Sequence, residues 1–280
     1  DRVHQDEFAT IQGTLDKVLA DVREAVEDWQ RMHAQLTHAV EEIAQDPPPL
    51  PADEVRESLA FLTWLGENHF TFLGSREYRL ERNGDDETLV AVPGTGLGIL
   101  RADPTGRGVL PPLAAAKARE KTLLVLAKAN SRATVHRPVH LDYVGVKTFD
   151  ESGEVNGERR FLGLFSSAAY TESVTRIPLL REKSRAVLEA AGMDPRGHDG
   201  KALMDVLETY PRDELFQTSV EELVPIATSV MHIRERRQLR LFLRADVYGR
   251  FWSVLVYLPR DRYNTTVRER IAELLRERLD

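Results

Sequence analysis

The sequence predicts an α+β protein: a long N-terminal helix, an antiparallel sheet domain with helices, a helical connector and the start of a second sheet unit. Three observations support this fold class. A helical pattern without proline covers residues 4–45, strand patterns joined by short turns occupy residues 70–166, and helix signals dominate residues 178–236. Short turns between successive strands favour antiparallel pairing, and such a sheet is expected to bury one face beneath helices.

The composition is that of an ordinary globular protein with a mildly acidic surface. The chain has 280 residues and a formal net charge of −7, and its length predicts about two domains. Its negative charge disfavours nucleic acid and anionic membranes as partners, so we expect neither. The sequence contains no cysteine, which excludes disulfides and thiolate catalysis and makes the cytoplasm the expected compartment.

The ends of the sequence indicate a piece of a longer chain. The first residue is not Met, and the last residue falls on a helical pattern. No apolar run reaches the length of about 18 residues that predicts a transmembrane helix. We therefore expect no membrane partner.

Residues 1–46 are predicted to form one long amphipathic helix. Apolar residues recur every seven positions in two sets, Phe8, Leu15, Val22, Trp29, Leu36, Ile43 and Ile11, Val18, Ala25, Met32, Ala39. Further apolar residues widen this stripe beyond a narrow seam, which favours packing on a globular neighbour. A dimerising coiled coil is the alternative interpretation.

The proline-rich residues 47–51 form the clearest boundary in the chain, because consecutive prolines lack amide donors and favour a stiff connector. Asp53 is the expected N-cap of a helix over residues 54–67. A strand at residues 70–80 and the turn chemistry of residues 83–85 then predict a hairpin with a strand that follows directly.

The centre of the sheet is predicted at residues 158–170, where charged residues precede an apolar strand and small residues close it. The apolar residues occupy both faces, Phe161, Gly163 and Phe165 on one and Leu162 and Leu164 on the other. This pattern is typical of a strand that is covered on both sides. Further strands are expected at residues 122–127 and 139–149, with Asn156 and Gly157 as a turn.

The remaining helices are marked by their end signals. An alanine-rich helix is expected near residues 113–120, and Pro178 opens a helix that Gly192 ends. Residues 199–210 form another helix, and Ser219 begins a capping box that opens the last helix of the connector.

Residues 238–280 are predicted to be half of a βαββαβ unit. Strands at residues 239–245 and 251–258 flank a turn, and Asn264 or Thr266 caps a final helix. The turn is the most promising candidate site of the chain.

Four residues of this turn, Arg244, Asp246, Tyr248 and Gly249, are the candidates for binding a small regulatory ligand or for an interface contact. Main-chain amides beside Gly249 would hold a polar group. A plain hairpin is the alternative, and turn chemistry alone favours it.

Other motifs indicate no chemistry. Gly94, Gly96 and Gly98 lack the third glycine and the following helix of a dinucleotide fingerprint, so a loop is expected. His136 and His140 fall on a strand pattern, where residues four apart are too distant to share one metal. We therefore predict no catalytic, cofactor-binding or metal-binding residue in this chain.

Several motifs in order resemble the N-terminal part of the large bacterial NAD-specific glutamate dehydrogenases. They lie at residues 69–74 (HFTFLG), 98–100 (GIL), 157–163 (GERRFLG), 177–181 (IPLLR), 198–200 (HDG), 210–216 (YPRDELF), 248–251 (YGRF) and 258–263 (LPRDRY). The likeness extends from about residue 54 to the end, and residues 1–46 carry little of it.

The resemblance implies a PAS-like domain at residues 53–175, a helical connector at 176–237 and a partial ACT-like, ferredoxin-like unit at 238–280. In that family the dehydrogenase domain lies downstream, so NAD is expected there and not in this chain. The parent reaction converts L-glutamate, NAD and water into 2-oxoglutarate, ammonia and NADH.

The expected role is therefore that of a non-catalytic regulatory and oligomerisation region. Its expected partners are the downstream domains of the same chain, further copies in a homo-oligomer and a small, amino-acid-like effector. A stand-alone small-molecule sensor of the PAS or ACT type is the alternative. A self-sufficient enzyme is disfavoured, because no motif of this sequence supplies a catalytic site.

Overall fold

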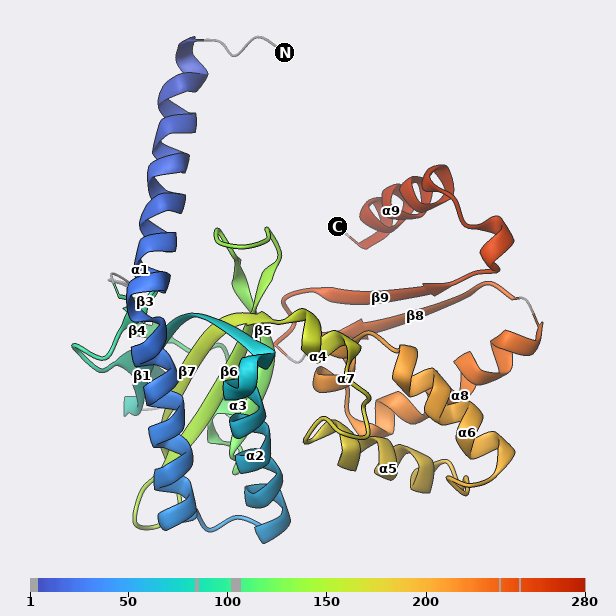
Figure 1. The fold of residues 1–280 in the computed structure, drawn as a ribbon, viewed down its shortest axis with the longest axis horizontal. Helices are drawn as coiled ribbons and strands as arrows, with labels where there is room; N and C mark the ends of the chain where they lie inside the picture. The colour runs from blue at the N-terminus through green and yellow to red at the C-terminus, as the bar shows by residue number, and fades with distance from the viewer. Residues whose placement is uncertain (1–4, 84–85, 102–106, 237, 247, 280) are drawn as a thin grey trace. The chain divides into compact units, whose positions relative to one another are not determined.

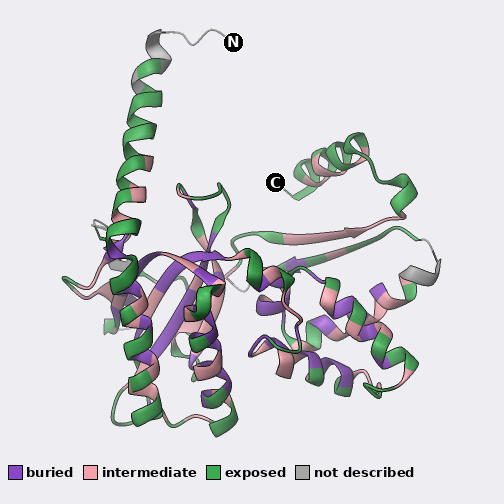
Figure 2. Ribbon diagram, in the orientation of Figure 1, coloured by how far each residue is buried: buried purple, intermediate pink, exposed green. Residues whose placement is uncertain are grey.

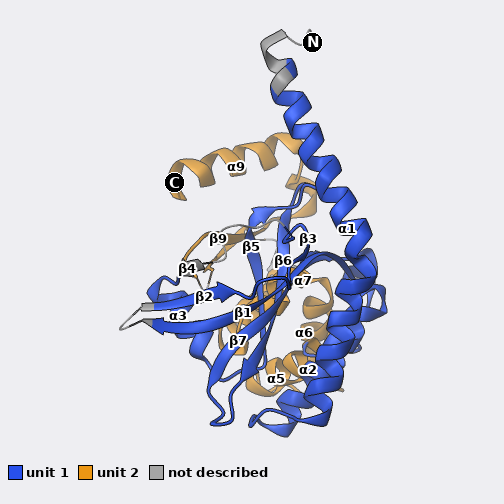
Figure 3. Ribbon diagram, turned by 90° about the vertical axis from the view of Figure 1, so that its left-hand side faces the viewer, with its two compact units in different colours: residues 1–179 blue, residues 180–280 orange. Residues whose placement is uncertain are grey.

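The computed structural model describes residues 5–83, 86–101, 107–236, 238–246 and 248–279. The chain forms two compact units, residues 1–179 and residues 180–280 (Figure 3). The fold class is the predicted one, because a long N-terminal helix, an antiparallel sheet, further helices and a two-stranded sheet follow one another along the chain (Figure 1).

The predicted long helix is confirmed as α1 (Gln5–Gln45). Its C-terminal half packs on strands of the sheet through side chains that are at most 5% exposed, Ala25, Met32, Leu36 and Ala39. Its N-terminal half carries apolar side chains that are exposed, and Figure 2 shows this change along the helix. The favoured interpretation, packing on a globular neighbour, therefore holds for the C-terminal half alone.

Helix α2 (Ala52–Trp64) follows the prolines and leads into the sheet through a π-helical turn at Leu65–His69. The prediction of Asp53 as N-cap is wrong, because Pro51 occupies that position. Asp53 lies in the first turn instead, where its negative charge interacts favourably with the positive end of the helix dipole. Asn68 has a φ of 68° and ends the helical conformation before the first strand.

The sheet of unit 1 has seven strands in the order β4-β2-β1-β7-β6-β5, with β3 paired to β1. The strands are β1 (Phe70–Asn83), β2 (Asp86–Ala91), β3 (Leu97–Gly98), β4 (Arg107–Val109), β5 (Leu124–Arg132), β6 (His140–Phe149) and β7 (Val155–Phe165). All pairs are antiparallel, as predicted. Strands β3 and β4 were not predicted, because segments of two and three residues are too short to show a period.

Strand β7 lies between β1 and β6, which confirms the predicted centre of the sheet. Phe161 and Leu164 are each 1% exposed and lie on opposite faces, so both faces are covered. The prediction of a turn at Asn156 and Gly157 is wrong, because both residues lie inside β7. A side chain at Gly157 would collide with the carbonyl of Tyr78 on β1, so this glycine permits the close approach of two strands.

Two short helices and a turn complete unit 1. The predicted alanine-rich helix is confirmed as α3 (Pro112–Arg119), and α4 (Ser167–Thr171), which was not predicted, follows β7. In the turn between β6 and β7, the Asp150 carboxylate accepts hydrogen bonds from the amides of Ser152 (2.9 Å) and Glu154 (3.0 Å). These bonds fix the turn without an external partner.

Unit 2 begins with a helical segment. Its helices are α5 (Leu180–Ala190), α6 (His198–Thr209), α7 (Arg212–Gln217) and α8 (Val220–Arg236). Gly192 has a φ of 67° directly after α5, as expected of a helix end. The capping box of α8 is confirmed, because the Ser219 amide donates to Glu222 (3.4 Å) and the Glu222 amide donates to Ser219 (3.2 Å).

The rest of unit 2 is a hairpin and a helix, namely β8 (Arg240–Ala245), β9 (Trp252–Tyr257), a 3-10 turn (Arg260–Arg262) and α9 (Thr265–Leu279). The hairpin is antiparallel, as predicted. Of the two predicted caps, Asn264 is the one that acts, because its side-chain oxygen accepts a hydrogen bond from the Val267 amide at 2.9 Å. No residue of α9 is buried.

Candidate functional site

The predicted site residues lie at the β8–β9 turn, but their side chains serve two separate clusters. Arg244 is the last residue but one of β8 and pairs with Glu214 of α7, whereas Asp246 pairs with Arg250 within the turn. Arg244 is 7% exposed and Asp246 is 3% exposed. Val247 lies outside the described residues.

The Asp246 carboxylate organises the turn. It accepts hydrogen bonds from the amides of Tyr248 (3.2 Å) and Arg250 (3.3 Å) and from Nε of Arg250 (2.6 Å). Gly249 has a φ of 66°, and its amide donates to the Asp246 carbonyl at 2.8 Å. Burial alone would raise the pKa of Asp246. The hydrogen bonds and the charge of Arg250 outweigh this effect and hold the pKa below its ordinary value, so the carboxylate stays ionised.

Arg250 also stacks over the Tyr248 ring, with its guanidinium carbon 4.7 Å from the ring centre. The polar groups of the turn therefore engage one another. A regulatory ligand or an interface at Arg244, Asp246, Tyr248 and Gly249 stays a prediction.

The Arg244–Glu214 contact is a buried, two-point ion pair. Nε of Arg244 lies 2.9 Å from Oε2 of Glu214, and its terminal nitrogen donates to Oε1 at 3.0 Å. The side chains are 6% and 13% exposed. Such a bidentate pair fixes orientation as well as distance, so it holds strand β8 against helix α7.

Lys183 of α5 binds the C-terminal end of α7. Its ammonium group donates to the carbonyls of Leu215 (2.7 Å), Phe216 (3.1 Å) and Thr218 (2.9 Å). These carbonyls lie where a helix leaves its acceptors without internal partners. Burial, and to a smaller extent the charge of Arg244, lower the pKa of Lys183 to about 8.

Neither Lys183 nor the pairing of Glu214 with Arg244 was predicted from the sequence. Lys183 and Leu215, and likewise Glu214 and Arg244, are about 30 residues apart in sequence. Only the tertiary fold brings them together, and no local periodicity signals such a pairing.

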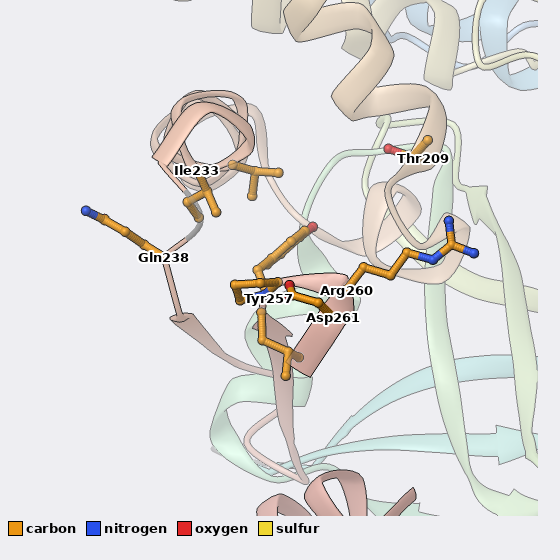
Figure 4. Close-up of a pocket in the computed structure, with 9 residues that line it drawn as sticks. Thr209, Ile233, Gln238, Tyr257, Arg260 and Asp261 are labelled. Carbon is orange, nitrogen blue, oxygen red and sulfur yellow. The ribbon is translucent and has the colours of Figure 1, made fainter. Parts of the chain in front are cut away.

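A second feature of unit 2 is a pocket of about 670 Å³ beneath β9 (Figure 4). It is lined by Thr209, Val230, Ile233, Gln238, Tyr257, Leu258, Pro259, Arg260 and Asp261. In Figure 4 the Arg260 side chain extends towards Thr209, and Ile233 lies on the opposite side of the Tyr257 ring. The pocket therefore has an apolar side and a charged rim, a composition typical of small-molecule sites.

The glycine-rich segment of unit 1 is a loop, as predicted. Gly98 has a φ of 57° in β3, and its amide donates to the buried Asp28 carboxylate of α1 at 2.9 Å. A turn, not a helix, follows through Arg101. Among the described residues, no group of three or more histidine or acidic side chains is placed to hold a metal ion.

No helix in the described part of the chain has the length and apolar character needed to cross a membrane.

Comparison with protein families assigns two regions. Residues 177–236 match the model of glutamate dehydrogenase, helical motif 1, and residues 240–280 match that of the glutamate dehydrogenase ACT2 domain. The Glu214–Arg244 ion pair joins these two regions.

Curated relatives match nearly the whole chain. The chain is 42% identical to the NAD-specific glutamate dehydrogenase of Halomonas elongata over 98% of its own length, and 40% identical to that of Pseudomonas aeruginosa over 99%. A protein of the same name from Mycobacterium tuberculosis is 34% identical over 96% of the chain. The chain spans 17% of the first two relatives and 16% of the third. It therefore belongs to the family of the NAD-specific glutamate dehydrogenases and matches the part that carries helical motif 1 and the ACT2 domain.

Proposed function

We propose that this chain is a non-catalytic regulatory and oligomerisation region of a large NAD-dependent glutamate dehydrogenase. The observation that carries the proposal is the match of residues 177–236 and 240–280 to a helical motif and an ACT2 domain, in a chain that spans 17% of its relatives. The whole protein would convert L-glutamate, NAD and water into 2-oxoglutarate, ammonia and NADH.

In this proposal NAD and L-glutamate bind in downstream domains, outside these 280 residues. The 280 residues supply architecture rather than catalytic groups. Residues 53–175 act as a PAS-like domain. The partners are the downstream domains of the same chain, further copies of it and an amino-acid-like effector, all in the cytoplasm.

The ion pair between Glu214 and Arg244 supports a regulatory role, because it links the two matched regions through two hydrogen bonds. Coupling between distant sites needs elements that move together or exchange between two arrangements. A displacement of the β8–β9 hairpin would be transmitted to α7 through this pair and to α5 through Lys183.

The test of the regulatory role uses the complete polypeptide that contains this chain. Glu214→Gln is expected to shift the glutamate concentration at half-maximal rate by about fivefold, a typical coupling strength, while the rate at saturating substrates stays near that of the wild type. Arg185→Gln, which breaks an exposed pair of α5 with Glu182, is the matched control. Identical kinetics for Glu214→Gln, Arg185→Gln and the wild type would contradict the proposal.

A stand-alone sensor of the PAS or ACT type is the second candidate function, and the pocket beneath β9 favours it. Thermal unfolding of the 280-residue chain would be followed with panels of amino acids and nucleotides. A saturable rise in the unfolding temperature, together with no effect of the ligand on any dehydrogenase activity, would favour the sensor over the enzyme region.

A further inference from the structure

A histidine, an indole and a carboxylate meet near the end of unit 1. Trp64 is the last residue of α2, and His69 closes the π-helical turn that follows it. Glu172 follows α4 and begins the last segment of unit 1, residues 172–179, which we call the exit segment. The side chains of His69 and Glu172 are 17% and 23% exposed, so both are largely withdrawn from water.

Both ring nitrogens of His69 face an oxygen acceptor. Nδ1 lies 2.7 Å from the Trp64 carbonyl oxygen, and Nε2 lies 3.3 Å from Oε2 of Glu172. A neutral imidazole has one N–H group, so either neutral tautomer would turn a nitrogen lone pair towards an oxygen lone pair. The imidazolium has two N–H groups and donates to both oxygens. The geometry therefore matches the protonated ring.

Trp64 makes two contacts that favour the same state. Its indole ring stacks on the His69 ring, with the ring centroids 4.3 Å apart and an interplanar angle of 13°, and the face of an indole attracts a cation. The indole Nε1 also donates to Oε2 of Glu172 at 2.8 Å. This oxygen therefore accepts N–H groups from two rings, a role that suits an ionised carboxylate.

The other charged groups around the cluster are engaged elsewhere or exposed. They include Glu57 of α2, Glu67 of the π-helical turn, His33 of α1, Arg137 before β6, Tyr170 of α4 and Arg176 of the exit segment. His33 and Arg137 contact main-chain carbonyl oxygens at 3.0 and 3.1 Å. Arg176 is 72% exposed and its Nε is 3.9 Å from Oε1 of Glu172. The Glu172 carboxylate is therefore the negative group that faces a charge on the His69 ring.

The cluster fastens the first residue of the exit segment to α2. Farther along, Val174 and Ile177 are fully buried, and the Leu179 amide donates to the Glu57 carboxylate of α2 at 3.3 Å. Leu179 has a φ of 68°, a strained conformation that persists only where surrounding contacts hold it. Loss of the contact at Glu172 would therefore loosen a segment whose far end is strained.

We propose that His69 is a proton-operated clamp on the exit segment. The imidazolium binds the Trp64 carbonyl and the Glu172 carboxylate and holds the segment on α2. Loss of one proton to water removes one N–H donor, leaves one contact with two facing lone pairs and loosens the segment. Histidine is the side chain that exchanges its proton between pH 5 and 8, so the segment is held more firmly at pH 5.5 than at pH 8.

The clamp acts on the start of a matched region, because residues 177–236 match helical motif 1. A change of protonation at His69 would alter how firmly the first residues of this region are anchored to unit 1. The inference goes beyond the proposed function and does not depend on it, since it concerns the 280-residue chain itself.

The test is hydrogen exchange of the 280-residue chain at pH 5.5 and pH 8, with each amide rate divided by its intrinsic rate at the same pH. Protection of residues 172–179 is expected to fall by about tenfold in the wild type as the pH rises, as for the loss of one hydrogen bond to a charged group. Glu172→Gln keeps an acceptor for the Trp64 indole but removes the charge. It should therefore be less protected at pH 5.5 and lose most of the pH dependence.

His38→Gln is the matched control, because His38 of α1 makes an exposed contact of the same kind, 3.1 Å from Glu42. It should keep the wild-type pH dependence at residues 172–179. Ring-nitrogen NMR of the wild-type chain needs no variant, and both nitrogens of His69 should carry protons at pH 5.5. Equal wild-type protection at the two pH values would overturn the proposal, as would a neutral His69 ring at pH 5.5 or an unchanged pH dependence in Glu172→Gln.

Discussion

At the residue scale, unit 2 contains a buried ion pair between α7 and β8. Arg244 and Glu214 face each other at 2.9 and 3.0 Å while largely withdrawn from solvent. A buried ion pair adds little over well-packed apolar residues, but loss of one partner leaves an uncompensated charge. The pair therefore serves orientation more than stability.

Loss of one partner should be costly. Arg244→Met is expected to lower the free energy of unfolding by about 3 kcal/mol, and the double variant Arg244→Met, Glu214→Leu should recover most of that loss. Urea unfolding of the chain measures both. Arg185→Met, which breaks an exposed pair, should cost less than about 1 kcal/mol; similar losses for Arg244→Met and Arg185→Met would contradict the buried pair.

Lys183 makes stability depend on pH. Its pKa is about 8 in the folded chain, whereas the ordinary lysine value of 10.5 applies to the unfolded chain. Between these two pH values the unfolded chain therefore binds more protons than the folded chain. Stability should therefore rise as the pH increases from 8 to 10.5. The expected gain is about 1 to 3 kcal/mol, measured as the free energy of unfolding at each pH.

Lys147 contributes a second change of the same sign, because burial also lowers its pKa to about 8. Lys183→Met should remove its own part of the rise and leave the part from Lys147. An unchanged rise in Lys183→Met would show that Lys183 titrates normally in the folded chain.

Glycines set the spacing of elements in the sheet. A side chain at Gly163 of β7 would collide with the carbonyl of Thr71 on β1 and with the Phe70 ring, whereas a side chain at Gly13 of α1 meets no atom within 4 Å. The same substitution should therefore have opposite effects in the two elements.

Gly163→Ala should destabilise the chain by at least about 2 kcal/mol, because it forces strands apart in a close-packed sheet. Gly13→Ala should stabilise α1 by about 0.5 to 1 kcal/mol, since alanine is the better helix former. Thermal and urea unfolding compare the two variants. Equal effects of the two substitutions would contradict the packing described for β7.

The N-terminal half of α1 exposes a stripe of large apolar side chains. Phe8, Ile11, Leu15 and Leu19 are each more than half exposed, whereas the C-terminal half of the same helix buries one face on the sheet. The coiled-coil interpretation stays open for this half, and a homo-oligomer would cover it.

Self-association through this stripe is testable with two charges. Leu15→Glu combined with Leu19→Glu should shift the chain towards a monomer in analytical ultracentrifugation. Lys17 stands between these two leucines in the sequence but does not belong to the apolar stripe, so Lys17→Glu should leave the assembly unchanged. A wild-type chain that is monomeric at all concentrations would exclude this interface.

Periodicity predicted the long elements because their burial repeats along the sequence. The helical pattern of α1, the doubly covered β7 and the capping box of α8 all come from residues close in sequence. The π-helical turn at Leu65–His69 and the strand position of Gly157 depend on contacts with distant strands. Local propensity cannot encode such contacts.

The candidate site shows the same limit more strongly. The turn residues around Asp246 could be chosen from sequence, because aspartate and glycine signal a turn. The partners Lys183 and Glu214, and the pocket rim at Arg260 and Asp261, follow from tertiary packing of α5, α7, α8 and β9. No spacing rule brings these residues together.

The whole molecule combines a helix-and-sheet unit with a unit that matches helical motif 1 and the ACT2 domain of glutamate dehydrogenases. In the proposed function, these units sense and assemble, and the chemistry takes place elsewhere in the enzyme. Allosteric control requires separate sites for the effector and the substrate, which is why catalytic groups are not expected among these residues.

The most direct measurement is glutamate-dependent NADH formation by the purified 280-residue chain, compared with the complete polypeptide and with a mock purification. The account predicts activity for the complete polypeptide and none above the mock level for the chain. Glutamate-dependent NADH formation by the chain alone would contradict it, because catalytic groups would then lie within these residues.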